Sequence, residues 1–310
     1  MTKHPTQMTA TAIAEGVQEG SLSPIEVIDA HLTRVRERNK RTNAFVTITD
    51  DLAHEMAVDA ERAVQDGEPL GPLHGVPVAI KDLNDVDGVR TTSGSLLLKD
   101  SVAEEDDPFV ARLKQAGAVI IGKTNTPEFG VGTTTDNRIT GATKNPFDTD
   151  RVSGGSSGGA AAALADSLVP LAQGSDVGGS IRTPASLCGV YGLKPSYGLI
   201  PRGDRPNAFI SHTPMFHTGP MARTVADAAL ALDVMTGIHS RDPFSVPTDT
   251  EYHTAIDQPI DDLMIGYTPG LGTYPVEPHV RKTLDDAISA FERAGATVDR
   301  IHPDLGHDRT

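Results

Sequence analysis

The sequence contains, at positions 174 to 185, the stretch Gly174-Ser175-Asp176-Val177-Gly178-Gly179-Ser180-Ile181-Arg182-Thr183-Pro184-Ala185. Its glycines let the backbone turn sharply, so that successive N–H groups can converge on an anion. Thr183 and Pro184 are typical of an N-cap and a first helical residue, and a helix that begins there directs its partial positive charge toward the turn. A serine hydroxyl beside such donors suits a tetrahedral oxyanion. A turn that only joins a strand to a helix fits the same residues equally well.

A second block of glycine and serine precedes this stretch, Gly154-Gly155-Ser156-Ser157-Gly158-Gly159. Strong helix formers follow it at positions 160 to 165, so the block is predicted to be a loop-to-helix junction rather than a flexible linker. A phosphate-binding loop is the alternative. The block lacks the closing Lys-Ser/Thr of a P-loop, however, and it does not match a dinucleotide fingerprint.

A lysine, Lys81, closes the apolar run Val76-Pro77-Val78-Ala79-Ile80, which predicts a short strand. Two roles are open for its side chain. It can pair with Asp82 or Asp85, which is a structural role. Alternatively, burial and hydrogen bonds to serine hydroxyls lower its pKa until it acts as a neutral base near pH 7.

The composition limits the classes of protein to which the chain can belong. With 310 residues, of which 38% are hydrophobic, the chain can bury a substantial core in one large domain or two moderate ones. Its 42 acidic residues against 27 basic ones give a formal charge of −15, which repels phosphate backbones, so direct nucleic-acid binding is not expected. The acidic surplus is also compatible with a salt-rich cytoplasm.

Signals for targeting, disulfides and metals are missing. No apolar run reaches membrane-spanning length and residues 1–7 lack the apolar core of a signal peptide, which predicts a cytoplasmic protein without a membrane partner. The single cysteine, Cys188, excludes an internal disulfide and is predicted to be a small buried residue. His212 and His217 lie outside any His-Glu-x-x-His pattern, so they are interpreted as surface or packing residues and no metal is predicted.

Helical and strand patterns alternate along the chain, which favours an α/β fold. The first long helix is predicted to begin at Ser23-Pro24, with Ile25, Ile28, Leu32 and Val35 on one apolar face. Further helices are predicted at 50–65, 107–115, 160–165, 223–235 and 277–294, and strands at 76–80, 118–122, 167–173, 263–267 and 296–301. Residues 133–152 are polar and rich in turns, and are predicted to form a long ordered loop. We expect a helical segment, 1–70, packed on a core formed by 71–310.

Several long motifs in a fixed order make the sequence resemble the amidase signature family. Besides the two glycine-serine blocks they are His-Gly-Val-Pro-Val-Ala-Ile-Lys-Asp at 74–82, Gly-Lys-Thr-Asn-Thr-Pro-Glu-Phe-Gly at 122–130, Gly-Val-Tyr-Gly-Leu-Lys-Pro at 189–195 and Gly-Pro-Met-Ala-Arg-Thr-Val-Ala-Asp at 219–227. The likeness covers most of the chain. It implies a mixed β-sheet core covered by helices and a reaction that needs no metal or organic cofactor.

The resemblance also implies roles for individual residues. Ser180 matches the family's nucleophile, Ser156 its bridging serine, which follows a cis peptide bond, and Lys81 its base. The backbone N–H groups predicted to hold the oxyanion are those of Val177, Gly178, Gly179 and Ser180. Four further residues are candidates to line the site: Asn125, Ser157, Asp176 and Arg182. For the last two we favour a structural role, in which they brace the turn by pairing with each other or with backbone groups.

One departure from the family pattern concerns length. Family members normally continue well past a point such as residues 303–310, with elements that cover the site. The sequence is therefore interpreted as a C-terminally truncated form, whose activity and stability stay open.

Three functions follow. The first is an amidohydrolase that cleaves a carboxamide C–N bond to a carboxylate plus ammonia or an amine, through an acyl-enzyme on Ser180, with a small-molecule amide as its partner. The second is the glutaminase (A) subunit of a tRNA-dependent amidotransferase. The third is an inactive, truncated family member. The sequence does not establish the oligomeric state and leaves a homodimer open.

Overall fold

The computed structural model describes residues 4–203, 215–272 and 274–303. The chain forms two compact units, Met1–His253 and Thr254–Thr310. Among the described residues, no helix combines the length and the apolar character that crossing a membrane requires.

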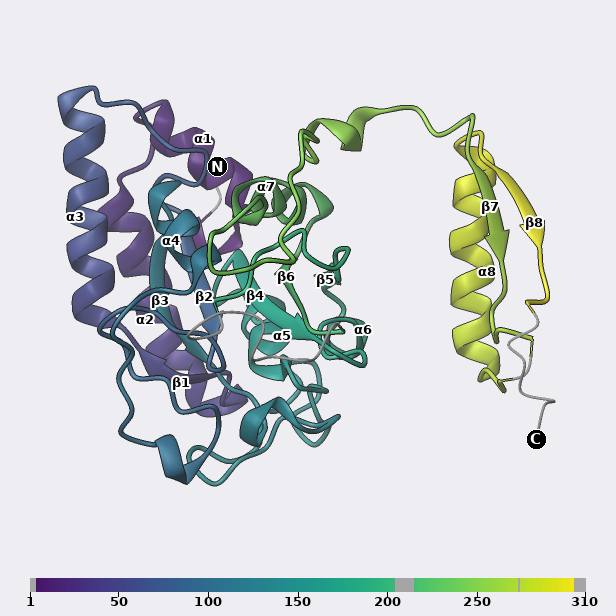
Figure 1. The fold of residues 1–310 in the computed structure, drawn as a ribbon, viewed down its shortest axis with the longest axis horizontal. Coiled ribbons are helices and arrows are strands. Elements are labelled where there is room, and N and C mark those ends of the chain that lie inside the picture. Colours follow the sequence, from purple (N-terminus) through teal and green to yellow (C-terminus); the bar gives the residue numbers. More distant parts are fainter. Residues whose placement is uncertain (1–3, 204–214, 273, 304–310) are drawn as a thin grey trace. The chain divides into compact units, whose positions relative to one another are not determined.

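The first unit is built on a mixed six-stranded sheet with the order β1-β3-β2-β4-β6-β5. Its strands are β1 (Phe45–Ile48), β2 (Pro77–Lys81), β3 (Val119–Thr124), β4 (Leu171–Asp176), β5 (Tyr191–Gly192) and β6 (His217–Ala222). Strand β2 runs parallel to both β3 and β4, whereas β1 and β6 pair antiparallel with β3 and β4. The carboxyl ends of the three parallel strands therefore meet at one edge of the sheet (Figure 1).

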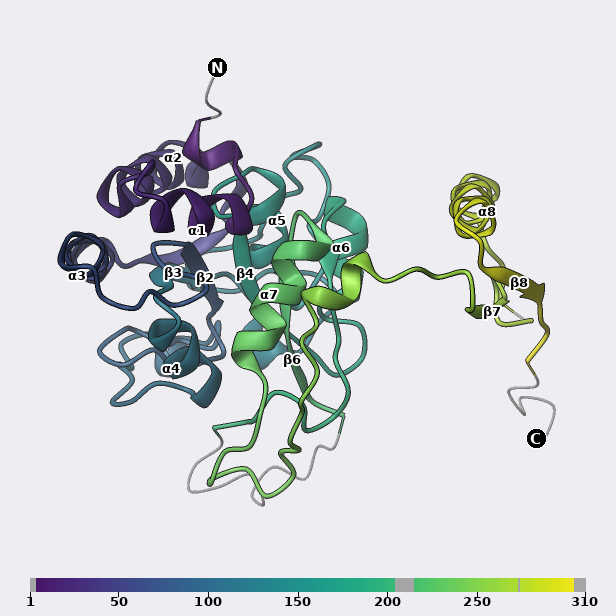
Figure 2. The same ribbon diagram turned by 90° about the horizontal axis from the view of Figure 1, so that it is seen from above.

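Helices cover both faces of this sheet. They are α1 (Ala10–Gln18), α2 (Pro24–Thr42), α3 (Asp50–Asp66), α4 (Pro108–Gln115), α5 (Gly158–Ala165), α6 (Arg182–Cys188) and α7 (Val225–Met235). Short 3₁₀ turns occur at η1 (Pro5–Gln7), η2 (Leu96–Leu98) and η3 (Glu128–Gly130). Figure 2 shows α2 and α5 on one side of β2 and β4, with α4 on the other.

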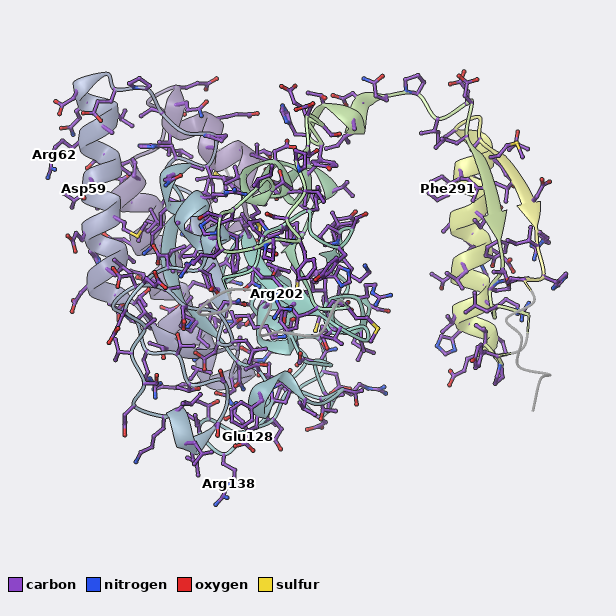
Figure 3. All side chains as sticks on the ribbon, viewed as in Figure 1. Asp59, Arg62, Glu128, Arg138, Arg202 and Phe291 are labelled. Carbon is purple, nitrogen blue, oxygen red and sulfur yellow. The ribbon has the colours of Figure 1, made fainter. Side chains whose placement is uncertain are left out.

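Alternation along the strands separates the two apolar cores. Val78 and Ile80 of β2 pack into one cluster with α1, α4 and α7, whereas Ala79 between them packs into the other with α2, α3 and α5. This is the two-residue period of a strand that is buried on both faces. The helices that precede residue 70 contribute to both clusters, while α3 keeps a polar outer surface on which Asp59 and Arg62 lie (Figure 3).

Most predicted elements are confirmed to within a few residues. Helix α2 begins at Pro24, and the Ser23 hydroxyl accepts a hydrogen bond from the Glu26 N–H, as expected for an N-cap. Helix α3 ends at Asp66 and is followed by the predicted Gly67 as its C-cap, which has a left-handed φ of 68°. The stretch 133–152 contains no helix and no strand.

Two predicted boundaries near the glycine-rich turn are wrong. Strand β4 covers Leu171–Asp176 rather than 167–173, so Ser175 and Asp176 belong to the strand. Helix α6 begins at Arg182 with Ile181 as its N-cap, so Thr183 lies inside the helix and does not cap it. The reason is that the Asp176 carboxylate accepts hydrogen bonds from the N–H groups of Ile181 and Arg182, which is the function that a capping side chain normally performs.

The second unit contains η5 (Thr254–Asp257), β7 (Met264–Tyr267), α8 (Pro278–Arg293) and β8 (Thr297–Arg300). Strands β7 and β8 pair in parallel, with α8 between them in the sequence. The Tyr267 hydroxyl donates a hydrogen bond of 3.0 Å to Asp285, which joins the strand pair to the helix. The predicted helix and both predicted strands of this region are confirmed.

Candidate active site

Lys81 ends β2 and its side chain is completely buried. Its Nζ donates hydrogen bonds to three serine hydroxyls, those of Ser156 at 2.7 Å, Ser157 at 2.9 Å and Ser175 at 3.0 Å. Burial lowers the pKa of Lys81 from 10.5 to about 7, and the negative charge of Asp176 opposes that shift. Near neutral pH a large share of this amine is uncharged, which is what a general base requires.

The sequence brings the serines to Lys81 from two directions. Ser175 lies on β4, the strand next to β2, whereas Ser156 and Ser157 immediately precede α5. The peptide bond between Gly155 and Ser156 is cis. A Cβ at Gly159 would lie 2.3 Å from the backbone nitrogen of Asn125, so glycine there lets the first turn of α5 approach the end of β3 closely.

Ser180 lies in the half-exposed turn between β4 and α6. Its carbonyl oxygen accepts a hydrogen bond of 3.0 Å from the Ser157 N–H, which ties this turn to the glycine-serine block. No hydrogen bond joins the hydroxyls of Ser156 and Ser180, both of which belong to the described residues. The structure thus brings Lys81 and Ser156 together, and the step from Ser156 to Ser180 stays a prediction.

Asp176 and Arg182 brace that turn, as the sequence suggested. The buried carboxylate accepts two hydrogen bonds from the Arg182 guanidinium, at 2.9 and 3.0 Å, and one of 2.8 Å from the Gly179 N–H. Burial alone raises the pKa of Asp176, but these hydrogen bonds outweigh it and hold the pKa well below its ordinary value. Of the four predicted oxyanion donors, Gly179 is therefore the one whose N–H group already has a partner.

Asn125 follows β3 and is completely buried. Its amide nitrogen donates to the Gly141 carbonyl and the Thr143 hydroxyl, and its carbonyl oxygen accepts from the amide of Asn137. These contacts fasten the long loop to the end of the sheet. The proposal that Asn125 lines the site stays a prediction, as it does for Ser157.

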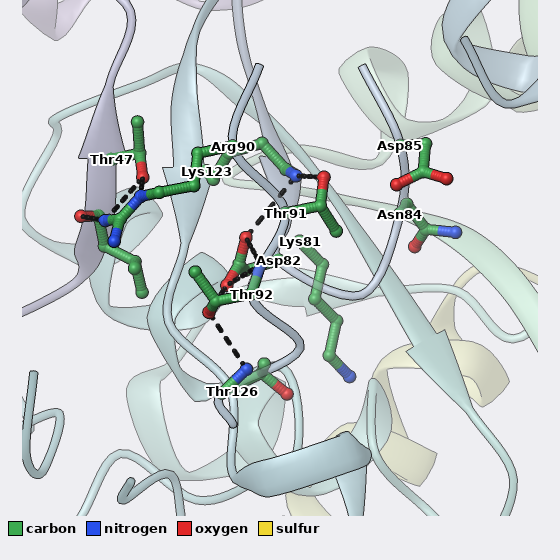
Figure 4. A network of polar contacts seen from close by, with 12 residues as sticks. Thr47, Lys81, Asp82, Asn84, Asp85, Arg90, Thr91, Thr92, Lys123 and Thr126 are labelled. Atoms are coloured by element: carbon green, nitrogen blue, oxygen red, sulfur yellow. Dashed lines mark hydrogen bonds and ion pairs between the residues drawn. The ribbon is translucent and has the colours of Figure 1, made fainter. Parts of the chain in front are cut away.

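The acidic neighbour of Lys81 has a different partner from the one considered for it in the sequence. Asp82 lies 3.4 Å from Nζ of Lys123, a second completely buried lysine, and accepts hydrogen bonds from the N–H and hydroxyl of Thr92. Lys123 in turn donates to the Thr91 hydroxyl at 2.7 Å. Figure 4 shows this network at the ends of β2 and β3. Among the described residues, Lys81 thus has no acidic partner within hydrogen-bond distance, and its amine donates to the three serine hydroxyls instead.

Sequence reasoning missed Ser175, the third hydroxyl on Lys81. The signal was present, because residues two apart on a strand share a face. Gln173 and Ser175 both contact Lys81, the first through its Oε1, which accepts from the Lys81 N–H, and the second through its hydroxyl. Extending the predicted strand to Asp176 would have placed both side chains beside β2.

The other candidate ligands lie apart from this cluster. Cys188 is buried, and burial raises the pKa of its thiol to about 12, so it is not a reactive thiolate at neutral pH. His217 lies at the start of β6, with its ring edge-on to Tyr197, and His212 falls outside the described residues. Within the described part of the chain, no group of three or more His, Cys, Asp or Glu side chains is arranged to hold a metal ion.

Known proteins are similar to this chain over almost its whole length. The model of the Amidase family matches residues 26–307. An acylamidase of Rhodococcus erythropolis is 42% identical over 97% of this chain, and the A subunit of a glutamyl-tRNA(Gln) amidotransferase from Carboxydothermus hydrogenoformans is 40% identical over 95%. The chain spans 62% and 60% of the lengths of these two relatives.

Solved structures give the same result. A bacterial aryl acylamidase of the amidase signature family superimposes with a TM-score of 0.91 at 38% identity. A 6-aminohexanoate cyclic dimer hydrolase, solved with its substrate, superimposes with a TM-score of 0.88 at 35% identity. Each alignment covers 98% of this chain and 62% of the other.

Proposed function

Because this chain belongs to the amidase signature family, we propose that it hydrolyses a carboxamide C–N bond, giving a carboxylate and ammonia or an amine, through an acyl-enzyme on Ser180. The observation that carries the proposal is the buried amine of Lys81, which contacts Ser156 at 2.7 Å and has a pKa of about 7. An amine in this state can accept a proton from a serine hydroxyl at neutral pH, which ordinary exposed lysines cannot do.

The proposed reaction passes protons along one row of groups. Neutral Lys81 takes the proton of Ser156, Ser156 takes that of Ser180, and the Ser180 oxygen attacks the amide carbonyl. The Ser180 hydroxyl turns toward Ser156 in this step. The C–N bond breaks as the amine is protonated along the same row, and water then releases the acyl group from Ser180 as a carboxylate.

The charge on the carbonyl oxygen needs donors that are not already engaged. The N–H groups of Val177, Gly178 and Ser180 lie in the turn that Asp176 and Arg182 brace, and we assign the oxyanion to them. Gly179 contributes only if its N–H is shared with the Asp176 carboxylate, because it already donates there at 2.8 Å. Removing one well-placed donor of this kind costs roughly 3 to 4 kcal/mol of transition-state stabilisation.

A second candidate is the glutaminase activity of an amidotransferase, which the 40% identity to the A chain of such an enzyme favours. In that case the ammonia released from glutamine passes to a partner complex. Glutamine dependence separates the two, since a general amidase also turns over amides that lack an amino acid moiety.

The deciding experiment measures ammonia and amine release by the 310-residue chain from a panel that includes glutamine, acetamide, benzamide and acetanilide. We expect release from at least one amide, and none from the Ser180→Ala variant. Release that persists in purified Ser180→Ala would remove Ser180 as the nucleophile. No release from any amide by a folded chain would favour an inactive family member.

A further inference from the structure

A cavity of about 340 Å³ opens beside the candidate site. Three phenylalanines, Phe109, Phe129 and Phe216, line it together with Leu83. The other lining residues are mostly polar or charged: Asn84, Asp85, Ser93, Asp107, Arg202, Gly203 and Thr218. A cavity of about 150 Å³ with apolar walls is enough to hold benzene. This one therefore has room for a ring and for the polar group attached to it.

Two of the residues that line the cavity, Phe129 and Thr218, are neighbours of the Lys81 cluster. Phe129 precedes Gly130, where a Cβ would lie 3.7 Å from the Ser156 hydroxyl and 2.6 Å from Leu83 Cδ1. Across β4 and β6, Thr218 pairs with Ser175, which places their side chains on the same face, and Ser175 is one of the hydroxyls on Lys81. A ring in the cavity thus lies next to the groups proposed to cleave the amide.

We propose that this cavity binds an aromatic ring of the amide substrate and that Phe129 determines this preference. The inference rests on the proposed amidase function and names its substrate class. Aromatic rings pack edge-to-face or offset against one another more favourably than their area alone accounts for. Phe129 is 51% exposed, so a large part of its ring is available for such a contact.

The backbone holds Phe129 in an unusual conformation. Its φ is 52°, and that of Ser93, whose carbonyl accepts a hydrogen bond of 2.7 Å from the Phe129 N–H, is 49°. Non-glycine residues rarely adopt this left-handed region, and those that do gather at functional sites. Two left-handed residues joined by a hydrogen bond form this wall of the cavity.

Contacts of the buried Asp82 hold the segment that contains Ser93. The Ser93 N–H donates to the Asp82 carbonyl at 2.9 Å, while the Asp82 carboxylate holds Thr92 and faces Lys123 (Figure 4). The hydroxyl of the buried Ser95 donates a hydrogen bond of 2.6 Å to Glu128, the residue before Phe129. Lys123 and Asp82 are therefore positioning residues for the cavity.

Binding without turnover tests this inference separately from the reaction. Ser180→Ala is titrated with benzamide and with acetamide, and each dissociation constant is measured by ligand-observed NMR. We expect benzamide to bind at least tenfold more tightly than acetamide. Equal affinity for the two amides would overturn the inference, and this comparison needs no substitution in the cavity.

The residue assignment needs a second variant. Phe129→Gly, made in the Ser180→Ala background, removes the ring and suits the left-handed backbone, so that the fold is kept, which circular dichroism checks. We expect it to weaken benzamide binding at least fivefold and to leave acetamide binding unchanged. The matched control is Phe147→Ala, because Phe147 is 73% exposed and does not line the cavity.

The outcomes separate the two proposals. Unchanged benzamide affinity in Phe129→Gly, or an equal loss in Phe147→Ala, overturns the role of Phe129. Ring-dependent binding by a chain that releases no product from any amide supports the cavity assignment and contradicts the proposed reaction. Turnover of amides without any preference for a ring supports the proposed reaction and contradicts the cavity assignment.

Discussion

The Arg182 guanidinium donates two hydrogen bonds to the Asp176 carboxylate, from Nε to Oδ2 at 3.0 Å and from Nη2 to Oδ1 at 2.9 Å. The same carboxylate is the charged group that raises the pKa of Lys81 against the effect of burial. The guanidinium therefore does more than hold the turn. By neutralising Asp176 it limits how strongly that charge favours the protonated form of Lys81.

Arg182→Met is predicted to shift the acidic limb of the rate profile toward higher pH. An uncompensated Asp176 raises the pKa of Lys81, so the amine stays protonated to a higher pH and the base is lost there. We expect a shift of about one pH unit in kcat/KM. The control is Arg62→Met, which breaks an exposed ion pair with Asp59 on α3. An identical limb in Arg182→Met and the parent would contradict this coupling.

Lys81 is predicted to give stability its own pH dependence. Its pKa is about 7 in the folded chain against 10.5 for the free side chain, so between these values the unfolded chain binds more protons. The free energy of unfolding then rises with pH by about 1.4 kcal/mol per unit in this window. Lys81→Met should abolish amide hydrolysis and flatten that slope. Urea unfolding of both proteins at several pH values measures the difference, and parallel curves would refute the lowered pKa.

Ser156 and Ser157 offer a matched pair, because their hydroxyls lie 2.7 and 2.9 Å from the same amine. Only Ser156 belongs to the proposed proton row. Ser156→Ala is predicted to lower kcat by roughly 10² to 10⁴-fold, the range for loss of a proton-transfer group. Ser157→Ala removes the hydrogen bond from Lys81 and two hydrogen bonds with the Ser175 backbone, but no group of the proton row, so we expect it to lower kcat by about tenfold or less. Equal losses of kcat in the two variants would contradict the assignment of Ser156 alone to the proton row.

Local signals in the sequence predicted the scaffold well and the site in part. Ser23 before Pro24 and Gly67 after α3 act through their immediate neighbours, so the ends they mark could be predicted. The start of α6 could not, because the side chain that satisfies its N–H groups comes from Asp176 on the preceding strand. The sequence predicted that Asp176 braces the turn through Arg182 or backbone groups, but it did not indicate that the carboxylate takes the place of an N-cap.

The cavity could not be predicted from the sequence either. Its walls come from segments around residues 83, 93, 109, 129 and 216, and their meeting depends on how β2, β3 and β6 are arranged. A left-handed φ at Phe129 also runs against the preference of that residue type. The buried pairing of Lys123 with Asp82 was missed for a related reason, since a lysine beside an aspartate in the sequence suggested Lys81 as the partner.

Lys123 and Asp82 give the last prediction, on stability. Both side chains are completely buried and lie 3.4 Å apart, so Lys123→Met leaves the Asp82 charge without its cation. We expect the free energy of unfolding to fall by about 3 to 5 kcal/mol, the range for breaking a buried pair from one side. Adding Asp82→Asn removes the stranded charge, so the double variant should lose less than the sum of the two single losses. Urea unfolding of the four proteins gives the coupling energy, and additive losses would mean that the two charges do not interact.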